Sequence, residues 1–271
     1  MKILLIGCGK MGGAMLSAWL ARDLITHAAV VDPAVHELQL QFAPHRPLLD
    51  IYSSLEQLPK DFVTDLLVLA VKPQQMTELL ATLSTIAQPS WPVMTIAAGL
   101  RVSYYARYLP QNPIIRVMPN TPAMLGQGMT VAVASPALNR EIRARAEKLL
   151  NATGDFFWLT DELQMDAAMA VSASGPAYFF YWVEMLAKAG AAAGLSNEDA
   201  MRLARQTLIG SGAMAATRAD ISLEQMRREV TSPGGVTEAT LRVWETGDAF
   251  QKFITAGIAA NTKRAKELAD C

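Results

Sequence analysis

Short apolar runs alternate with amphipathic segments over the first 160 residues. Five runs predict buried strands, because each meets Gly, Pro or Asp near its end: Ile3–Ile6, Ala28–Val31, Leu66–Val71, Val93–Ala97 and Ile114–Val117. Two further strands are expected at Met129–Ala134 and Phe156–Leu159. Helices are expected between strands, among them Gln74–Ile86 and a segment from about Ala137 to Asn151. This alternation predicts a parallel sheet with right-handed crossovers.

The pattern changes near Thr160, where β-branched runs give way to Ala, Met, Leu and Gln. Helices are expected at Asp161–Ala193 (interrupted at Ser174–Pro176), Asn197–Thr217, Leu223–Val230, Glu238–Glu245 and Ala249–Ala269. The predicted fold is therefore an α/β Rossmann-type doubly wound sheet over residues 1–160, followed by an all-α C-terminal domain over residues 161–271.

Composition narrows the classes of partner. The formal net charge is -1, and 51% of residues are hydrophobic against 18% charged, so neither a nucleic-acid surface nor a polybasic membrane surface is expected. The apolar stretch Ala177–Leu195 carries Glu184 and Lys188, which favours a buried helix over a membrane span. The N-terminal apolar run is too short for a secretory signal, so a cytoplasmic location is expected. A small molecule is the expected partner.

Small residues and cysteines add two expectations. The run from Gly190 to Gly194 lets neighbouring elements approach closely but supplies little area to bury, which favours a homodimer or a larger assembly over a monomer. Cys8 and Cys271 are the only two cysteines. We interpret them as free thiols in a reducing compartment rather than as a disulfide.

A glycine motif follows the first predicted strand and opens a helix. In Gly7-Cys8-Gly9-Lys10-Met11-Gly12, Gly7 permits a tight turn, Gly9 lets a pyrophosphate approach the backbone, and Gly12 lets the helix pack on the strand. The helix N-terminus offers free N–H groups to phosphates. A glycine turn without a ligand is the simpler alternative.

Asp32 ends the next strand, where a carboxylate would hold the adenosine ribose of a dinucleotide. A carboxylate accepts hydrogen bonds from ribose hydroxyls and repels a 2′-phosphate. The residues therefore favour NADH over NADPH. His36 could face a 2′-phosphate, but a surface histidine is the simpler interpretation.

Three loops follow later strands of the predicted sheet. They contain Ala70-Val71-Lys72-Pro73, Ala97-Ala98-Gly99 and Met118-Pro119-Asn120-Thr121-Pro122. Each loop alone is adequately explained as a strand terminator. Together, at the carboxyl ends of successive strands, they predict a cofactor site to which Ala70, Val71, Lys72, Pro73, Ala98 and Asn120 contribute.

The second half holds one polar glycine loop, Thr231-Ser232-Pro233-Gly234-Gly235-Val236-Thr237, before a helix expected from Glu238. Backbone N–H groups, two hydroxyls and the positive end of a helix make a good receptor for a carboxylate. An ordinary capped helix after a turn is the alternative. The Ser172–Pro176 break could line the same pocket or simply mark a kink.

The residues disfavour two other chemistries. No His/Cys cluster has metal-ligand spacing, so no metal is expected, and the three histidines fall outside the loops assigned to the reactive end. A reduction that needs no strong side-chain acid would suit the chain. Hydride addition to a protonated imine is such a reaction.

Along its full length, the chain resembles the pyrroline-5-carboxylate reductase family. The resemblance rests on the glycine motif and the three loops above, with Arg116 and Val117 preceding the last of them, and on two more specific motifs: Ser172-Ala173-Ser174-Gly175-Pro176-Ala177-Tyr178 and Thr231–Thr237. It implies reduction of 1-pyrroline-5-carboxylate to L-proline with NADPH or NADH, the last step of proline biosynthesis. It also implies a homodimer, sometimes assembled into a homodecamer.

The resemblance further implies residue roles. The carboxylate of this cyclic imino acid would be held by the loop of Ser232, Gly235 and Val236, with its ring nitrogen near the Thr237 hydroxyl. Lys72, Ala98 and Asn120-Thr121-Pro122 would border the nicotinamide. The chain departs from several members that carry Ser, Asn or Arg around the position of Asp32, residues suited to NADPH.

Two other functions stay open from the sequence. A 3-hydroxyacid dehydrogenase would need a lysine acid/base in the second domain, and Lys188 is the candidate. A non-catalytic NAD(P)-sensing protein would keep Gly7–Gly12 but would need no organised Thr231–Thr237 loop.

Overall fold

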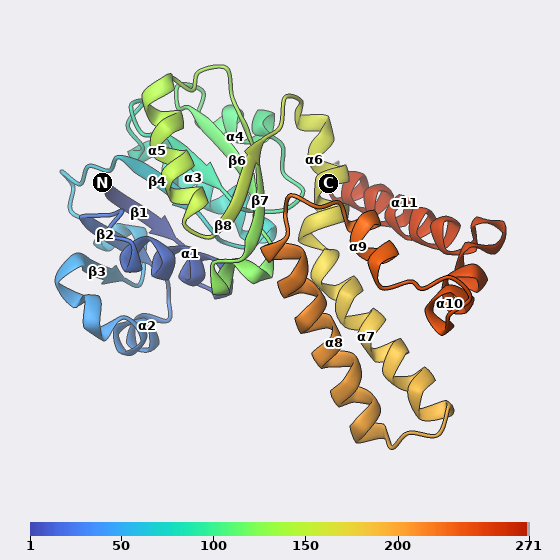
Figure 1. The fold of residues 1–271 in the computed structure, drawn as a ribbon. Helices are drawn as coiled ribbons and strands as arrows, with labels where there is room; N and C mark the ends of the chain where they lie inside the picture. The colour runs from blue at the N-terminus through green and yellow to red at the C-terminus, as the bar shows by residue number, and fades with distance from the viewer. Residues whose placement is uncertain (270–271) are drawn as a thin grey trace. The chain divides into compact units, whose positions relative to one another are not determined.

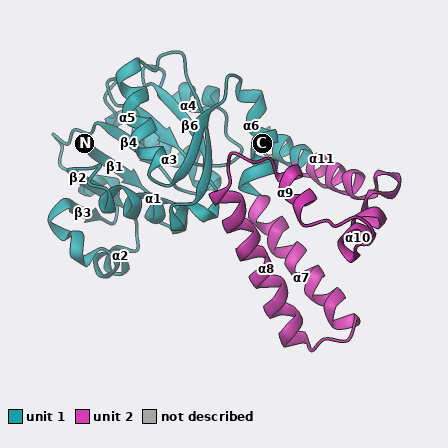
Figure 2. Ribbon diagram, viewed as in Figure 1, with its two compact units in different colours: residues 1–174, 262–271 teal, residues 175–261 magenta. Residues whose placement is uncertain are grey.

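The computed structural model describes residues 1–269 (Figure 1). They form two compact units. Unit 1 comprises Met1–Ser174 together with Thr262 and the described residues after it, and unit 2 comprises Gly175–Asn261 (Figure 2). The sheet of unit 1 ends at Trp158, just before the domain boundary expected after residue 160. The short helices that follow the sheet still belong to unit 1.

Unit 1 is built on one eight-stranded sheet. Its strands are β1 (Lys2–Ile6), β2 (His27–Val31), β3 (Leu49–Tyr52), β4 (Leu66–Leu69), β5 (Val93–Thr95), β6 (Ile114–Met118), β7 (Gly128–Ala134) and β8 (Gly154–Trp158). Their order is β3-β2-β1-β4-β5-β6-β7-β8. The first six follow the order of a dinucleotide-binding doubly wound sheet, in which the chain switches direction between β1 and β4. The predicted fold class is confirmed.

The sheet differs from the prediction at two strands. β7 runs antiparallel to β6, an exception to the parallel sheet that the alternation of strands and helices predicts. The physical reason is length, because residues 119–127 are too few for a crossover, which needs a dozen or more. The edge strand β3 was not predicted, since only Leu49 of its four residues is buried and no apolar run marks it.

Helices cover both faces of the sheet. Unit 1 contains α1 (Lys10–Ala21), α2 (Val35–Gln41), α3 (Met76–Ile86), α4 (Val102–Tyr108), α5 (Arg140–Asn151) and α6 (Met165–Ala168). Apolar residues of α1 and α5 share one core with one face of the sheet, and those of α3 and α4 share a second core with the other face. Trp19 of α1 donates its indole N–H to the Leu149 carbonyl of α5 over 2.9 Å. Two fully packed faces leave the strand ends as the place for a ligand.

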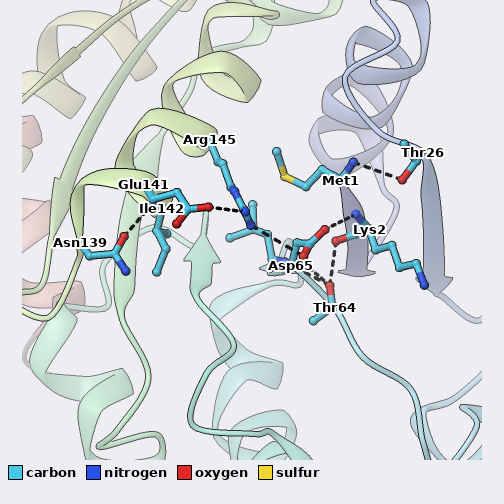
Figure 3. A network of polar contacts seen from close by, with 10 residues as sticks. Met1, Lys2, Thr26, Thr64, Asp65, Asn139, Glu141, Ile142 and Arg145 are labelled. Atoms are coloured by element: carbon cyan, nitrogen blue, oxygen red, sulfur yellow. Dashed lines mark hydrogen bonds and ion pairs between the residues drawn. The ribbon is translucent and has the colours of Figure 1, made fainter.

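The amino-terminal edge of the sheet is closed by polar contacts (Figure 3). Asp65, just before β4, accepts the backbone N–H of Lys2 over 2.8 Å and lies 3.7 Å from the Arg145 guanidinium. The Thr64 hydroxyl donates to the Lys2 carbonyl over 3.1 Å. These contacts stabilise the amino-terminal edge of the sheet. The glycine turn lies at the opposite, carboxyl-terminal edge.

Unit 2 is helical. It contains α7 (Gly175–Ala192), α8 (Asn197–Thr217), α9 (Leu223–Glu229), α10 (Val236–Glu245) and the first part of α11 (Ala249–Ala269). A short 3₁₀ segment, Thr246–Asp248, connects α10 to α11. The 3₁₀ segments of unit 1 are Ala43–Leu48, Leu55–Gln57, Pro73–Gln75, Thr121–Leu125 and Glu162–Gln164. Within residues 1–269, no helix is long and apolar enough to cross a membrane.

Small residues let α7 and α8 pack closely, as their composition suggested. A Cβ added at Gly190 would lie 3.3 Å from the Leu195 side chain and 3.5 Å from that of Ala200. The predicted helix over Asp161–Ala193 is broken into α6, a π-helical turn at Met169–Ala173 and α7. The helix is therefore interrupted, but slightly before the predicted Ser174–Pro176: a π turn, a common cause of helix kinks, ends at Ala173, and Gly175 and Pro176 already begin α7.

Candidate functional site

The glycine turn lies where the carboxyl ends of β1 and β4 meet. β1 and β4 pair in parallel, with Ile6 opposite Leu69, so Gly7 lies beside Ala70. Gly7 has φ +87°, and a Cβ on it would lie 2.8 Å from the Ala70 carbonyl atoms. A Cβ on Gly12 would lie only 2.4 Å from the Gly7 carbonyl oxygen. Both positions exclude any side chain, so strand, turn and helix pack as the motif predicts.

Gly9 is different, because a Cβ added there would meet nothing within 4 Å. Gly9 is the N-cap of α1 and is exposed, as is Lys10, while Met11 is half-buried. The first N–H groups of α1 have no intrahelical acceptor. The open space over Gly9 and these free donors fit the diphosphate of a dinucleotide.

Asp32 joins the glycine turn to the end of β2. One carboxylate oxygen accepts the Cys8 N–H over 2.7 Å, and the other accepts the Ala34 N–H over 2.9 Å. Each oxygen keeps a second lone pair for another donor. Burial, and then the Asp32 charge, raise the pKa of the Cys8 thiol to about 12. Cys8 is a buried free thiol, whereas Cys271 lies outside the described residues.

The next two loops lie at the same edge of the sheet. Ala70 and Val71 are half-buried beside Gly7, Lys72 is exposed, and Pro73 begins a 3₁₀ turn. Beyond β5, Ala98 is exposed and Gly99 has φ +85°. The sheet thus brings these predicted residues to one edge.

Asn120 has a structural role that the sequence did not reveal. Its side chain is buried, its Oδ1 accepts the Met129 N–H over 2.8 Å, and its Nδ2 donates to the Ser172 carbonyl over 3.1 Å. Asn120 therefore ties the loop after β6 to the π-helical turn. The Asn120 side chain thus fixes the shape of this loop.

A buried ion pair holds the same edge. The Arg116 guanidinium of β6 donates to Glu162 Oε1 over 2.9 Å, and the same oxygen accepts the Val102 N–H over 2.8 Å. The Arg116 side chain is only 2% exposed. Glu162 thereby connects β6, the start of α4 and the segment that follows the sheet. Sequence reasoning missed this role, because the partners are far apart in the chain.

The Thr231–Thr237 loop lies in unit 2 and differs in detail from the prediction. α10 begins at Val236 rather than at Glu238 as expected, because Gly235 serves as its N-cap. The Gly235 N–H donates to the Ser232 carbonyl over 2.9 Å, and the Gly234 N–H donates to a Glu238 carboxylate oxygen over 2.6 Å. The two glycine N–H groups are thus used within the loop.

The remaining donors of the loop belong to the first turn of α10. The N–H groups of Val236 and Thr237 have no intrahelical acceptor. Thr237 is exposed, and Val236 as a whole residue is 88% exposed. Two N–H groups and the Thr237 hydroxyl are the groups that this loop can offer to a carboxylate and a ring nitrogen.

Other candidate groups are not gathered into a site. Lys188, the base required by a hydroxyacid dehydrogenase, is an exposed residue of α7. Over the described part of the chain, no group of three or more His, Cys, Asp or Glu residues is placed to hold a metal ion.

Comparisons with known proteins decide the family. The model "Pyrroline-5-carboxylate reductase dimerisation" matches residues 162–268, and "NADP oxidoreductase coenzyme F420-dependent" matches residues 2–99. The pyrroline-5-carboxylate reductase of Pseudomonas aeruginosa is 34% identical over 99% of this chain and 97% of that protein. The chain belongs to the pyrroline-5-carboxylate reductase family. The predicted membership is therefore confirmed.

Solved members of the family share the fold. The pyrroline-5-carboxylate reductase of Coxiella burnetii has a TM-score of 0.87 at 30% identity and covers 98% of both chains. The Plasmodium falciparum pyrroline carboxylate reductase, solved with NADP bound, has a TM-score of 0.81 at 27% identity and covers 99% of this chain and 98% of that one. The first family match begins at Glu162 itself, next to the domain boundary expected from the sequence.

Proposed function

We propose that this chain reduces 1-pyrroline-5-carboxylate to L-proline with NADH or NADPH, the last step of proline biosynthesis. Membership in the family carries this proposal, supported by the open, unfilled space over Gly9 at the N-terminus of α1. When bound, the dihydronicotinamide supplies a hydride to the imine carbon. The electron pair of the C=N bond remains on nitrogen, which is already protonated, so the product is the neutral ring amine.

The chain's own residues bind and orient the two molecules. In this proposal Gly7, Gly9 and Gly12, with the N–H groups of Lys10 and Met11, receive the diphosphate. Ala70, Val71, Lys72, Pro73, Ala98 and Asn120 form the rest of the cofactor site. Catalysis here is mainly positioning and preorganised electrostatics, since the hydride chemistry belongs to the cofactor.

The substrate is held by the loop of Ser232, Gly234 and Gly235 and by the first turn of α10. The Val236 and Thr237 N–H groups bind its carboxylate, and the Thr237 hydroxyl hydrogen-bonds the ring nitrogen. The glycines act by shaping the turn, because their own N–H groups donate within the loop. This assignment narrows the one made from the sequence, which gave both glycines as donors.

Asp32 supports NADH as the preferred cofactor. Its carboxylate is held at the end of β2 by two backbone N–H groups. A 2′-phosphate beside this fixed charge would be repelled, whereas ribose hydroxyls could donate to its free lone pairs. The bound NADP of the Plasmodium falciparum relative is a property of that protein.

We further propose that the protein acts in the cytoplasm, where the reduced cofactor and free thiols are maintained.

We also propose a homodimer as the smallest working assembly. On α7, Phe179 and Phe180 are each 61% exposed. Between α7 and α11 lies an apolar groove of about 600 Å³, lined by Tyr178, Tyr181, Trp182, Phe253 and Ile254 among others. A monomer seldom exposes so much aromatic surface. Light scattering should give a mass of at least twice 29.4 kDa, and ten times 29.4 kDa for the decamer that the resemblance implies.

A steady-state assay of the purified protein tests the function. Consumption of NADH with 1-pyrroline-5-carboxylate, and formation of L-proline, are expected, with a higher kcat/KM for NADH than for NADPH. NADH binding without turnover would instead favour the sensing protein. Oxidation of 3-hydroxyacids that is lost in Lys188→Ala would favour the dehydrogenase.

A further inference from the structure

The Ser232–Gly235 segment forms a β-turn directly before α10. The Gly235 N–H donates to the Ser232 carbonyl over 2.9 Å, which closes the turn. Pro233 occupies the second position, and Gly234, the third, has φ +72°. Proline followed by a residue with positive φ identifies a type II turn. Types I and II differ by a flip of the central peptide, here the one between Pro233 and Gly234.

Glu238 holds that central peptide. Its carboxylate accepts the Gly234 N–H over 2.6 Å. A glutamate at the third helical position commonly reaches back to the N–H of the N-cap residue. Here the N-cap is Gly235, whose N–H is already used by Ser232, so Glu238 reaches one residue further back. The N–H that it accepts is the one whose direction distinguishes the two turn types.

From this geometry we propose that Glu238 is a positioning residue for substrate binding. It locks the turn in the type II form and so fixes the direction in which α10 presents the Val236 and Thr237 N–H groups. The proposal rests on the function proposed above, in which those groups bind the substrate carboxylate. Glu238 does not itself touch the substrate.

The hydrogen bond, rather than the charge, carries this role. Arg242, one helical turn further on, lies 3.6 Å from Glu238, and its side chain is 76% exposed. An exposed pair of this kind contributes little. A negative charge beside a carboxylate-binding turn would also weaken binding, so charge alone gives no reason for a glutamate at this position. A glutamine would keep the hydrogen bond without the charge.

Amide hydrogen exchange tests the contact without any turnover. In Glu238→Ala, the Gly234 amide should exchange about tenfold faster than in the parent protein, because its acceptor is lost. In Glu238→Gln, exchange should remain within about twofold of the parent. Equal exchange in the parent and in Glu238→Ala would overturn the proposal, whether or not the protein is a reductase.

Kinetics test the consequence. Glu238→Ala should raise the KM for 1-pyrroline-5-carboxylate about tenfold, with kcat reduced less than threefold and the KM for NADH unchanged. In Glu238→Gln, which keeps the hydrogen bond and removes the charge, the KM should be at or below the parent value. The matched control is Glu141→Ala, which removes another first-turn glutamate paired with an arginine four residues on, in α5. This control should change neither constant.

The outcomes separate the two proposals. A parent protein without imine reductase activity refutes the proposed function, while the exchange experiment still decides on the turn. Equal KM values for the Ala and Gln variants, both above the parent value, would show that the charge matters and would overturn the hydrogen-bond account. An unchanged KM in Glu238→Ala would overturn it as well.

Discussion

The Gly7–Gly12 turn of unit 1 and the Ser232–Gly235 turn of unit 2 both end at the N-terminus of a helix, but different parts of the chain hold them. The first is packed against the sheet, where Gly7 and Gly12 leave no room for a side chain. Asp32, directly after the next strand, accepts one of its N–H groups. The second is exposed, a Cβ on Gly234 would meet nothing within 4 Å, and its support comes from Glu238, four residues away.

This difference explains why two turns of similar composition should respond differently to amino-acid substitution. Substitutions in the first should disturb strand, turn and helix together, because tertiary packing fixes its shape. Substitutions of the side chains beside the second, Thr237 and Glu238, should change ligand binding with little change in stability, since few contacts depend on them. The following predictions test that contrast, from the largest expected effect to the smallest.

Gly12→Ala should lower the affinity for NADH about 10³-fold, equivalent to about 4 kcal/mol. The added methyl would lie 2.4 Å from a backbone oxygen that cannot move without shifting the helix. Fluorescence titration of NADH measures the effect. Gly13→Ala is the matched control, because its methyl would make only ordinary contacts, the nearest at 3.5 Å. Equal affinities of the two variants would show that packing does not fix the turn.

Cys8 should react slowly with thiol reagents in the folded protein, measured in a Cys271→Ser background. With its pKa raised to about 12, the thiolate is rare at pH 8, and labelling should be at least about 10²-fold slower than in urea. The pKa of Cys8 in the folded protein lies above the ordinary thiol value of 9.0, so the associated stability is present below pH 9 and is lost as pH rises toward 12. Equal labelling rates would contradict a closed turn.

Thr237→Ala should lower kcat about 10²-fold, an effect typical of one lost transition-state hydrogen bond. The thermal unfolding midpoint should stay unchanged, because Thr237 is exposed in the first turn of α10. Thr240→Ala, on the same helix, is the control and should keep full turnover. Parent-like turnover in Thr237→Ala would remove this hydroxyl from the mechanism.

Asp32→Asn should raise the kcat/KM ratio of NADPH to NADH about tenfold. The amide removes the charge that repels a 2′-phosphate, while its oxygen can still accept one of the two backbone N–H groups that Asp32 holds. Steady-state kinetics with both cofactors give the ratio. A parent that already prefers NADPH would refute our interpretation of Asp32.

The sequence predicted the first turn better than the second. Gly7, Gly9 and Gly12 follow a buried strand and open a helix. Their spacing alone predicted both the position of the turn and the close packing of helix on strand. For the second turn the sequence located the loop, but not the start of α10 or the use of the glycine N–H groups. Glu238, three residues after Gly235, is the capping signal that could have revealed both.

Other details depend on contacts that leave no local pattern. The four-residue strand β3 lies at a sheet edge and has a single buried residue, so no apolar run marks it. The direction of β7 follows from the length of one connection. Arg116 and Glu162 meet only once the sheet has formed, as do Asn120 and Ser172. Such long-range pairs require the folded structure.

A crystal structure of the protein with oxidised cofactor and L-proline would test the account most directly. We predict that the diphosphate lies on the N–H groups at the start of α1, and that the proline carboxylate accepts hydrogen bonds from Val236 and Thr237. A proline carboxylate bound to other groups, with those two N–H groups facing water, would contradict the account.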